Sequence, residues 1–217
     1  MNVVENSDSS PFPGFRLYFD DVGSASGRTD MYQINIRESG GAGGSSVRIE
    51  GATGSARSGQ WDHIFWSFTA GSATGLQLWI NGAEDANSPI NVSTIGDMGN
   101  SNGAVKFGET NAGGADRDGR IAECGFWNRV LTDPEIIALS KGFSPLHMRN
   151  GLVFYSDLGG KRTAEIDLRG GASGTVTGAV YVDHPRMMRP GSIFVPPFTV
   201  AAGGTTYPGY YGMAGWF

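Results

Sequence analysis

DGRIAECGFWNRVLTDPEIIALSKG, residues 118–142, is the stretch that decides the fold. Residues 121–127 alternate between two faces and end on aromatic side chains, which predicts a buried strand. Thr132 and Glu135 have the spacing of a capping box, and Pro134 suits the first turn of a helix because its missing N–H needs no partner there. The stretch therefore predicts a strand, a tight connection and one short helix that ends at Gly142.

The composition favours many short strands joined by tight turns. Among 217 residues there are 35 glycines, and charged residues make up only 17%. The length suits one domain with a core of its own. The net charge of −5 argues against nucleic acid as a partner, because phosphate contacts need clustered Lys and Arg.

The single cysteine and the amino-terminal residues exclude several further classes. Cys124 cannot form an intrachain disulfide, and its place on a strand face predicts a core residue rather than a nucleophile. We expect no membrane partner, because no run of eighteen apolar residues occurs. Residues 1–10 lack the basic start and apolar core of a signal peptide, so we expect synthesis in a cytoplasm.

Alternating apolar residues predict at least seven strands, which favours a two-sheet sandwich. The strands are predicted in FRLYF (15–19), MYQINI (31–36), the segment around Val47 and Ile49, WDHIFWSF (61–68), LQLWI (76–80), GAVKFGE (103–109) and residues 121–127. In WDHIFWSF both faces are apolar, as in an inner strand. In LQLWI, Leu76, Leu78 and Ile80 should point to the core, and Asn81-Gly82 should form a primed turn.

Two segments carry a resemblance to a known family. Residues 119–139 resemble the last strand and terminal helix of laminin-G-like (concanavalin A-like) jelly rolls. WDHIFWSF followed by LQLWINGAED is similar to the central pair of strands in that family. The resemblance covers about half the chain and implies an all-β, two-sheet antiparallel jelly-roll sandwich with one short helix, to which the composition of the tail adds an extended carboxyl-terminal arm.

The order of segments differs from that of most laminin-G-like domains. A segment similar to residues 151–182, with LVFYSDL and GTVTGAV, stands at the amino end in most of them. We interpret this as a circular permutation in which residues 151–182 close the sandwich. A separate second domain is the alternative, although about thirty residues are too few to bury a core.

The expected domain organisation has three parts. Residues 1–14 are predicted to be a flexible lead, residues 15–184 the jelly roll, and residues 185–217 a Pro- and Gly-rich arm. The arm is aromatic, which is unusual for a disordered linker, so we expect it to dock on another subunit; wrapping its own domain is the alternative. The aromatic residues of this assembly arm are Phe194, Phe198, Tyr207, Tyr210, Tyr211, Trp216 and Phe217.

One motif approaches a catalytic signature. The segment EIDLR, residues 165–169, resembles the Glu-x-Asp-x-Glu signature of retaining glucanases built on the same jelly roll. The resemblance would make Glu165 the nucleophile, but Arg169 stands in the place of the general acid. The three histidines form no motif, and no catalytic set can be assembled. We therefore expect no enzymatic activity and assign no catalytic residue.

Calcium is the one cofactor for which the sequence offers candidates. Some laminin-G-like domains bind calcium through Asp and Asn in rim loops, and Asp116 and Asp118 lie in such a loop, NAGGADRD. Asp97, Asn100 and Asn102 lie in another. Because Asx residues are common in turns and no ligand spacing is present, the turn interpretation is favoured over a metal site.

The second half of the chain indicates a function through a further resemblance. KGFSPLHMR, LVFYSDLGG, EIDLRGG, GTVTGA and DHPR look like laminin-G-like proteins of tailed bacteriophages, many of them virion components. This implies a non-enzymatic capsid decoration, or cement, protein located in the virion after synthesis in the host bacterial cytoplasm. Its expected partners are the major capsid protein and further copies of itself, for which we expect a trimer.

The alternative is a carbohydrate-binding, lectin-like module that attaches to a glycan on the host surface. Trp79 is the candidate glycan contact, because it lies opposite the core face of its strand and could stack on a sugar ring. Packing of Trp79 under a neighbouring loop is equally compatible with the sequence.

Overall fold

The computed structural model describes residues 2–7, 14–20, 27, 29–38, 45–98, 104–108, 119–159, 164–169 and 173–190. Within these residues the strands pair antiparallel, and one α-helix is present, which confirms the predicted jelly-roll sandwich. That helix has eight residues, too few to cross a membrane, and no other described helix is long enough.

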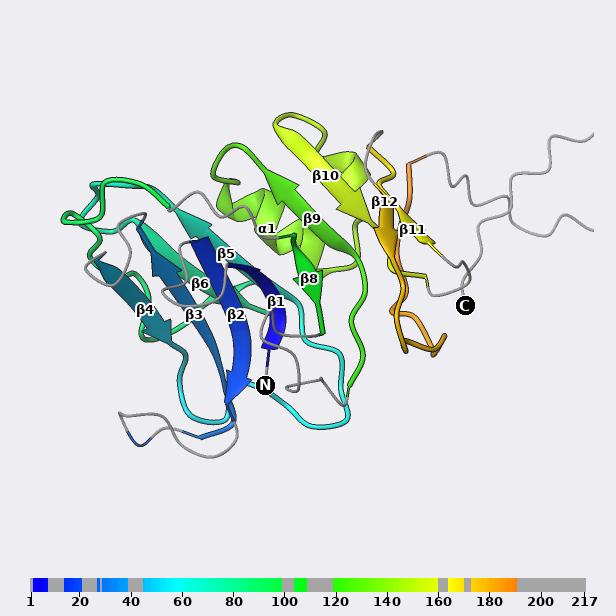
Figure 1. Ribbon diagram of the computed structural model, residues 1–217, viewed down its shortest axis with the longest axis horizontal. Helices are drawn as coiled ribbons and strands as arrows, with labels where there is room; N and C mark the ends of the chain where they lie inside the picture. Colours follow the sequence, from blue (N-terminus) through cyan, green and yellow to red (C-terminus); the bar gives the residue numbers. More distant parts are fainter. Residues whose placement is uncertain are drawn as a thin grey trace, which may run out of the picture.

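The first layer is a five-stranded sheet with the order β4-β3-β2-β1-β8 (Figure 1). Its strands are β1 (Asn2–Ser7), β2 (Gly14–Asp20), β3 (Met31–Arg37), β4 (Ser46–Glu50) and β8 (Lys106–Phe107). β2 and β3 pair along their whole length, with Phe15 opposite Ile36 and Leu17 opposite Ile34. These apolar residues face the second layer and are buried there with Ile49 of β4.

The second layer contains β5 (Ile64–Phe68), β6 (Leu76–Ile80) and β7 (Ala83–Glu84), hydrogen-bonded in that order. Leu76 and Leu78 are fully buried against the first sheet, as the alternation predicts. The ring centroid of Trp66 lies 5.0 Å from that of Phe15 in the facing layer. Asn81 and Gly82 both have positive φ, which confirms the predicted turn.

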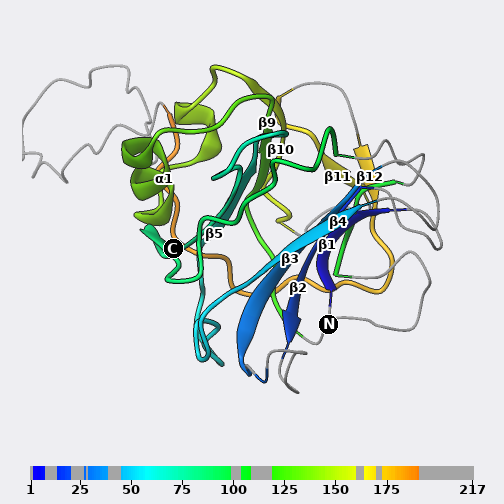
Figure 2. The same ribbon diagram turned by 90° about the vertical axis from the view of Figure 1, so that its left-hand side faces the viewer.

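Helix α1 (Asp133–Ser140) lies on the outer face of the second layer, on the side away from the first sheet (Figure 2). The capping box predicted from Thr132 and Glu135 is present. Ile136 and Leu139 of the helix are buried against Trp79 of β6. The outer face of β6 is therefore covered, and a second small core lies between α1 and the sheet.

The amino terminus corrects one prediction, because residues 2–7 are a strand and not a flexible lead. β1 pairs antiparallel with β2 on one side and with β8 on the other, so that Val4 lies opposite both Leu17 and Phe107. The segment NVVENS has no apolar alternation that could have predicted this. A strand whose place is set by backbone pairing on both sides leaves little signal in its own residues.

The chain after the helix adds strand β10 (Leu152–Ser156), which pairs antiparallel with β9 (Cys124–Trp127). Phe154 of β10 contacts Phe126, which packs against the main core, and their ring centroids lie 5.6 Å apart. Strands β11 (Ala164–Ile166) and β12 (Ser173–Thr175) form a separate hairpin. Residues 152–156 thus contribute to the sandwich, and the permuted chain order remains an interpretation of this arrangement.

Candidate functional site

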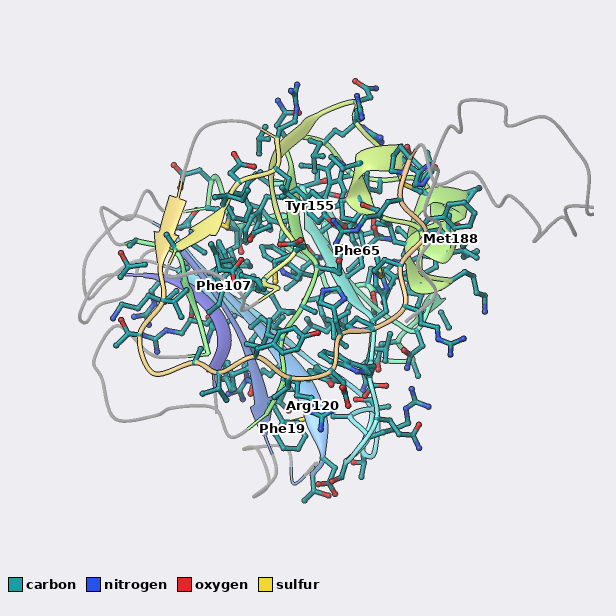
Figure 3. The ribbon with its side chains drawn as sticks, turned by 90° about the vertical axis from the view of Figure 1, so that its right-hand side faces the viewer. Phe19, Phe65, Phe107, Arg120, Tyr155 and Met188 are labelled. Carbon is teal, nitrogen blue, oxygen red and sulfur yellow. The ribbon has the colours of Figure 1, made fainter. Side chains whose placement is uncertain are left out.

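Residues 183–190, here called the strap, lie across the sandwich where α1, β9 and β10 meet (Figure 3). The backbone N–H of Met188 donates to the carbonyl oxygen of Gly142 at 2.6 Å, and the N–H of Ser144 donates to the carbonyl oxygen of Met188 at 2.9 Å. The strap therefore runs parallel to the chain that follows the helix, joined to it through a bridge between Phe143 and Met188. The first six residues of the predicted arm, 185–190, thus lie against their own domain.

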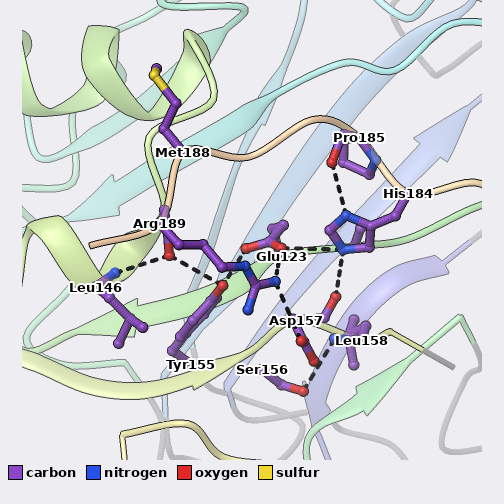
Figure 4. Close-up of polar contacts among 12 residues, drawn as sticks. Glu123, Leu146, Tyr155, Ser156, Asp157, Leu158, His184, Pro185, Met188 and Arg189 are labelled. Atoms are coloured by element: carbon purple, nitrogen blue, oxygen red, sulfur yellow. Dashed lines mark hydrogen bonds and ion pairs between the residues drawn. The ribbon is translucent and has the colours of Figure 1, made fainter. Parts of the chain in front are cut away.

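Glu123, immediately before β9, is the central anion of the site beneath the strap (Figure 4). Its side chain is only 7% exposed, and its backbone has a left-handed φ of 58°, which is uncommon for a residue other than glycine. One carboxylate oxygen accepts a hydrogen bond from the Arg189 guanidinium at 3.0 Å and lies 3.2 Å from Nε2 of His184. The other accepts from the hydroxyl of Tyr155.

His184 contacts acceptors through both of its ring nitrogens. Nδ1 lies 2.9 Å from the carbonyl oxygen of Pro185, and Nε2 lies 3.0 Å from that of Asp157 as well as near Glu123. Only the doubly protonated imidazolium can donate from both nitrogens. The hydrogen bond to Glu123, which outweighs the opposing effect of burial, raises the pKa of His184 to about 9. The geometry and the pKa therefore both give His184 a positive charge at neutral pH.

Arg189 and Asp157 complete the pairing of charges. The Arg189 guanidinium lies 3.4 Å from the Asp157 carboxylate, so this cation bridges Asp157 and Glu123. Two cations from the strap thus meet two carboxylates of the sandwich. Because opposite charges in such a site compensate for part of their desolvation, the cluster is suited to holding the strap in place.

Tyr155 of β10 is a neutral, buried member of the cluster. Its side chain is fully buried, and burial together with the neighbouring Glu123 carboxylate raises the pKa of its hydroxyl well above the ordinary value. The hydroxyl therefore stays protonated. It donates a hydrogen bond to the Glu123 carboxylate and accepts one from the hydroxyl of Ser144 at 3.2 Å. The sequence analysis assigned none of these residues to a site, because the three histidines form no motif.

A second histidine, His147, also contacts the strap. His147, in the short 3₁₀ helix η2 (Pro145–His147), places Nε2 3.0 Å from the carbonyl oxygen of Met188. His147 thus contacts the strap to which His184 belongs. Their separation of 37 positions conceals this.

A second site is a shallow groove of about 330 Å³ between edge strand β4 and the segment 87–90. It is lined by Arg48, Glu50, Asn87 and Ile90. Nε of Arg48 lies 2.9 Å from the Glu50 carboxylate, and the Asn87 amide donates to the backbone carbonyl of Glu50 at 3.1 Å. The groove thus combines a guanidinium, a carboxylate and an amide with one aliphatic side chain. Because these residues come from two distant segments, no sequence motif marks the groove.

Trp79 does not serve as an exposed glycan contact, and that prediction is wrong. Its side chain is 7% exposed and packs with Leu131, Ile136 and Leu139 beneath α1. The alternative, packing under a neighbouring element, is the one that the structure supports. The alternation in β6 placed Trp79 correctly opposite the main core, but the helix that covers it comes more than fifty residues later in the chain.

The calcium candidates Asp116 and Asp118 lie outside the described residues, as do Asn100 and Asn102. Among the residues that are described, no three His, Cys, Asp or Glu side chains gather closely enough to hold a metal ion. The seven aromatic residues of the arm, from Phe194 to Phe217, also lie outside the described residues.

The glucanase-like segment EIDLR covers the free edge of β10. The Asp167 carboxylate accepts hydrogen bonds from the backbone N–H of Tyr155 at 3.0 Å and from that of Arg169 at 2.8 Å. The Arg169 side chain donates to the carbonyl oxygen of Leu152 at 3.1 Å. Asp167 and Arg169 therefore satisfy backbone groups of an edge strand, as an edge without a partner strand requires.

Cys124 is partly buried in β9. Burial, with a further contribution from Glu123, raises the pKa of the Cys124 thiol to about 12. A thiol that stays protonated is a poor nucleophile, so the prediction of a structural cysteine agrees with its surroundings.

Residues 3–137 match the family model described as the concanavalin A-like lectin/glucanases superfamily, of the laminin-G type. The match covers more than half of the 217 residues and includes β2–β9 and most of the helix. The chain belongs to this superfamily. No curated protein and no solved structure matches it. Since the superfamily includes both lectins and glucanases, membership is compatible with a carbohydrate-binding module and does not decide whether the chain is an enzyme.

Proposed function

We propose that this superfamily member is a non-enzymatic structural protein of a bacteriophage virion, a capsid decoration protein that binds the major capsid protein through its carboxyl-terminal arm. The observation that carries the proposal is the strap. His184, Met188 and Arg189 are each held on the sandwich, so the segment beyond residue 190 starts from a fixed point beside α1. The resemblance of residues 141–186 to bacteriophage proteins supports the same conclusion.

Anchoring the residues that precede the arm should favour binding by the arm. Association costs conformational entropy, and a segment tethered to a rigid domain has less of it to lose. The arm sequence is rich in aromatic residues, which contribute much of the energy of protein interfaces. Many copies on one particle would then add modest individual affinities, and a trimer would multiply them further.

The test compares the full chain with a chain that ends at Pro190 and so retains the strap. Both are mixed with purified capsid shells assembled from a tailed bacteriophage major capsid protein, and binding is measured by co-sedimentation. We expect the full chain to bind and the shortened chain to lose at least tenfold in affinity. Equal binding by both chains, with the shortened chain folded, would show that the arm does not bind the capsid and would contradict the proposal.

The groove beside β4 favours carbohydrate binding as a second candidate function. Its volume of about 330 Å³ is within the range of small-ligand sites, and its Arg48, Asn87 and Ile90 provide hydrogen-bonding groups and an apolar surface. Superfamily membership supports the same function. A neutral hexose unit is the ligand class that such a mixture would hold.

Glycan-array binding of the full chain tests this candidate, with Arg48→Ala and Asn87→Ala as the informative variants. Asp133→Asn is the matched control, because Asp133 is exposed in the first turn of α1 and does not line the groove, whereas the exposed Glu84 of β7 accepts a hydrogen bond from Ser88 in the segment 87–90. Loss of binding in both groove variants but not in the control is expected. Binding that survives both substitutions would place the glycan elsewhere.

A further inference from the structure

The contacts of the strap depend unusually strongly on charge. Its contacts include the bridge at Met188, the contact of His147 with the carbonyl oxygen of Met188, and the ion pairs and hydrogen bonds of His184 and Arg189. The segment before it is largely exposed: Val180 is 78% exposed and Val182 is 39% exposed. The strap can therefore separate from the sandwich without disturbing the main core, which lies between the two sheets.

We propose that the contact between the strap and the sandwich, here called the clasp, depends on a proton. The imidazolium of His184 holds the strap on the sandwich, and the strap separates from it when His184 loses its proton. The inference concerns the anchor of the arm and holds whatever the arm binds.

The geometry gives the reason. A neutral imidazole has one N–H and one lone pair, yet both nitrogens of His184 face oxygen acceptors. After deprotonation one nitrogen would direct its lone pair at an acceptor, either the carbonyl oxygen of Pro185 or the oxygens of Asp157 and Glu123. Glu123 would also keep only one of its two cations while remaining almost fully shielded from water.

The other groups that face the cluster do not replace the lost proton. Tyr155 already donates to Glu123, and Ser144 donates to Tyr155. Arg189 already contacts both carboxylates. His147 contacts the strap at the carbonyl oxygen of Met188 rather than at Glu123.

The direction of the pH effect follows from linkage. The pKa of His184 is 6.5 when free and about 9 in the closed clasp, so its contribution is fully present below pH 6.5 and is lost as the pH rises through about 9. The two values correspond to an upper limit of roughly 70-fold in the closing equilibrium between pH 7 and pH 10. Solvent reaches part of the ring, which weakens its interactions, and we expect about tenfold.

Hydrogen exchange of the full chain, followed by mass spectrometry between pH 6 and pH 10 and corrected for intrinsic exchange rates, tests the clasp. The reporters are the backbone N–H groups of Met188 and Ser144, which bond across the junction. We expect their protection to fall about tenfold between pH 7 and pH 10, while that of the β2–β3 pair stays constant. Constant protection at the junction over this range would overturn the proposal.

Two variants and one control separate the clasp from a general effect of pH. In His184→Gln the junction should be weakly protected at every pH, and in Glu123→Gln the loss of protection should occur at lower pH than in the unaltered chain. Glu84→Gln should behave as the unaltered chain. If His184→Gln keeps full protection with an unchanged pH profile, the proposal is wrong.

A measurement on the unaltered chain keeps the proposal testable if these variants do not fold. Nuclear magnetic resonance titration of the three histidine rings gives each midpoint directly. We expect one ring to titrate near pH 9, together with a change in the Met188 amide signal. A chain in which all three rings titrate at or below pH 7 would refute the clasp.

Discussion

Replacement of Glu135 by Gln should weaken the junction between β9 and α1 in a pH-dependent way. The Glu135 carboxylate accepts two hydrogen bonds from the Arg129 guanidinium, at 2.6 and 2.8 Å, and one from the backbone N–H of Thr132 at 2.9 Å. Arg129 in turn donates to the carbonyl oxygen of Asn150 at 2.8 Å. One carboxylate thus caps the helix and fixes the arginine that joins it to the start of β10.

The size of the effect can be worked from this geometry. The paired guanidinium, with help from Thr132, lowers the pKa of Glu135 to about 2 from an ordinary value of 4.5. Taken at face value this shift corresponds to about 3 kcal/mol at neutral pH. Because much of the carboxylate is reached by solvent, we reduce this to about 1–2 kcal/mol, which is also the usual range for the loss of a helix cap.

Urea denaturation of the unaltered chain and of Glu135→Gln, at pH 7 and at steps down to pH 2, provides the assay. A group with a lowered pKa stabilises the fold above its unfolded value of 4.5 and loses that contribution as the pH falls towards 2. The two chains should therefore differ by about 1–2 kcal/mol at pH 7 and converge near pH 2. Glu84→Gln is the control. Equal stability at pH 7, or a difference that persists unchanged at pH 2, would refute the reasoning.

Three further predictions concern the helix, the strap and the cysteine. Trp79→Ala should lower the free energy of unfolding by about 3–5 kcal/mol in urea titrations, because it empties the core beneath α1, and it should leave any glycan binding of the folded protein unchanged. Gly142→Ala should destabilise the fold by about 1–2 kcal/mol and lower the protection of the Met188 amide in hydrogen exchange, since Gly142 has a φ of 90° and an added Cβ would lie 2.8 Å from the carbonyl oxygen of Arg186. Cys124 should react with a thiol reagent at pH 8 only after unfolding, and rapid reaction of the native chain would contradict its burial.

Local patterns predicted the parts of the fold that depend on neighbouring residues. The alternation in LQLWI placed Leu76 and Leu78 correctly in the core, because the faces of a strand follow directly from its period of two residues. The capping box and the Asn81-Gly82 turn were predictable for the same reason, since their partners lie within a few positions.

Features that depend on distant segments could not be predicted in this way. Trp79 is buried only because α1 returns over the outer face of β6. Likewise, Glu123 meets Asp157, His184 and Arg189 across separations of 34 to 66 positions, and no spacing rule connects them. The left-handed backbone of Glu123 marks the site in the structure, but nothing in the sequence predicts it.

The native mass of the full chain in solution, compared with that of the chain that ends at Pro190, tests the central claim most directly. An arm that docks on other subunits predicts a defined oligomer, for which we expect a trimer, and its loss in the shortened chain. If both chains are monomers and neither associates with capsid shells, the arm is not an assembly device. The groove beside β4 would then become the leading candidate for the function of this protein.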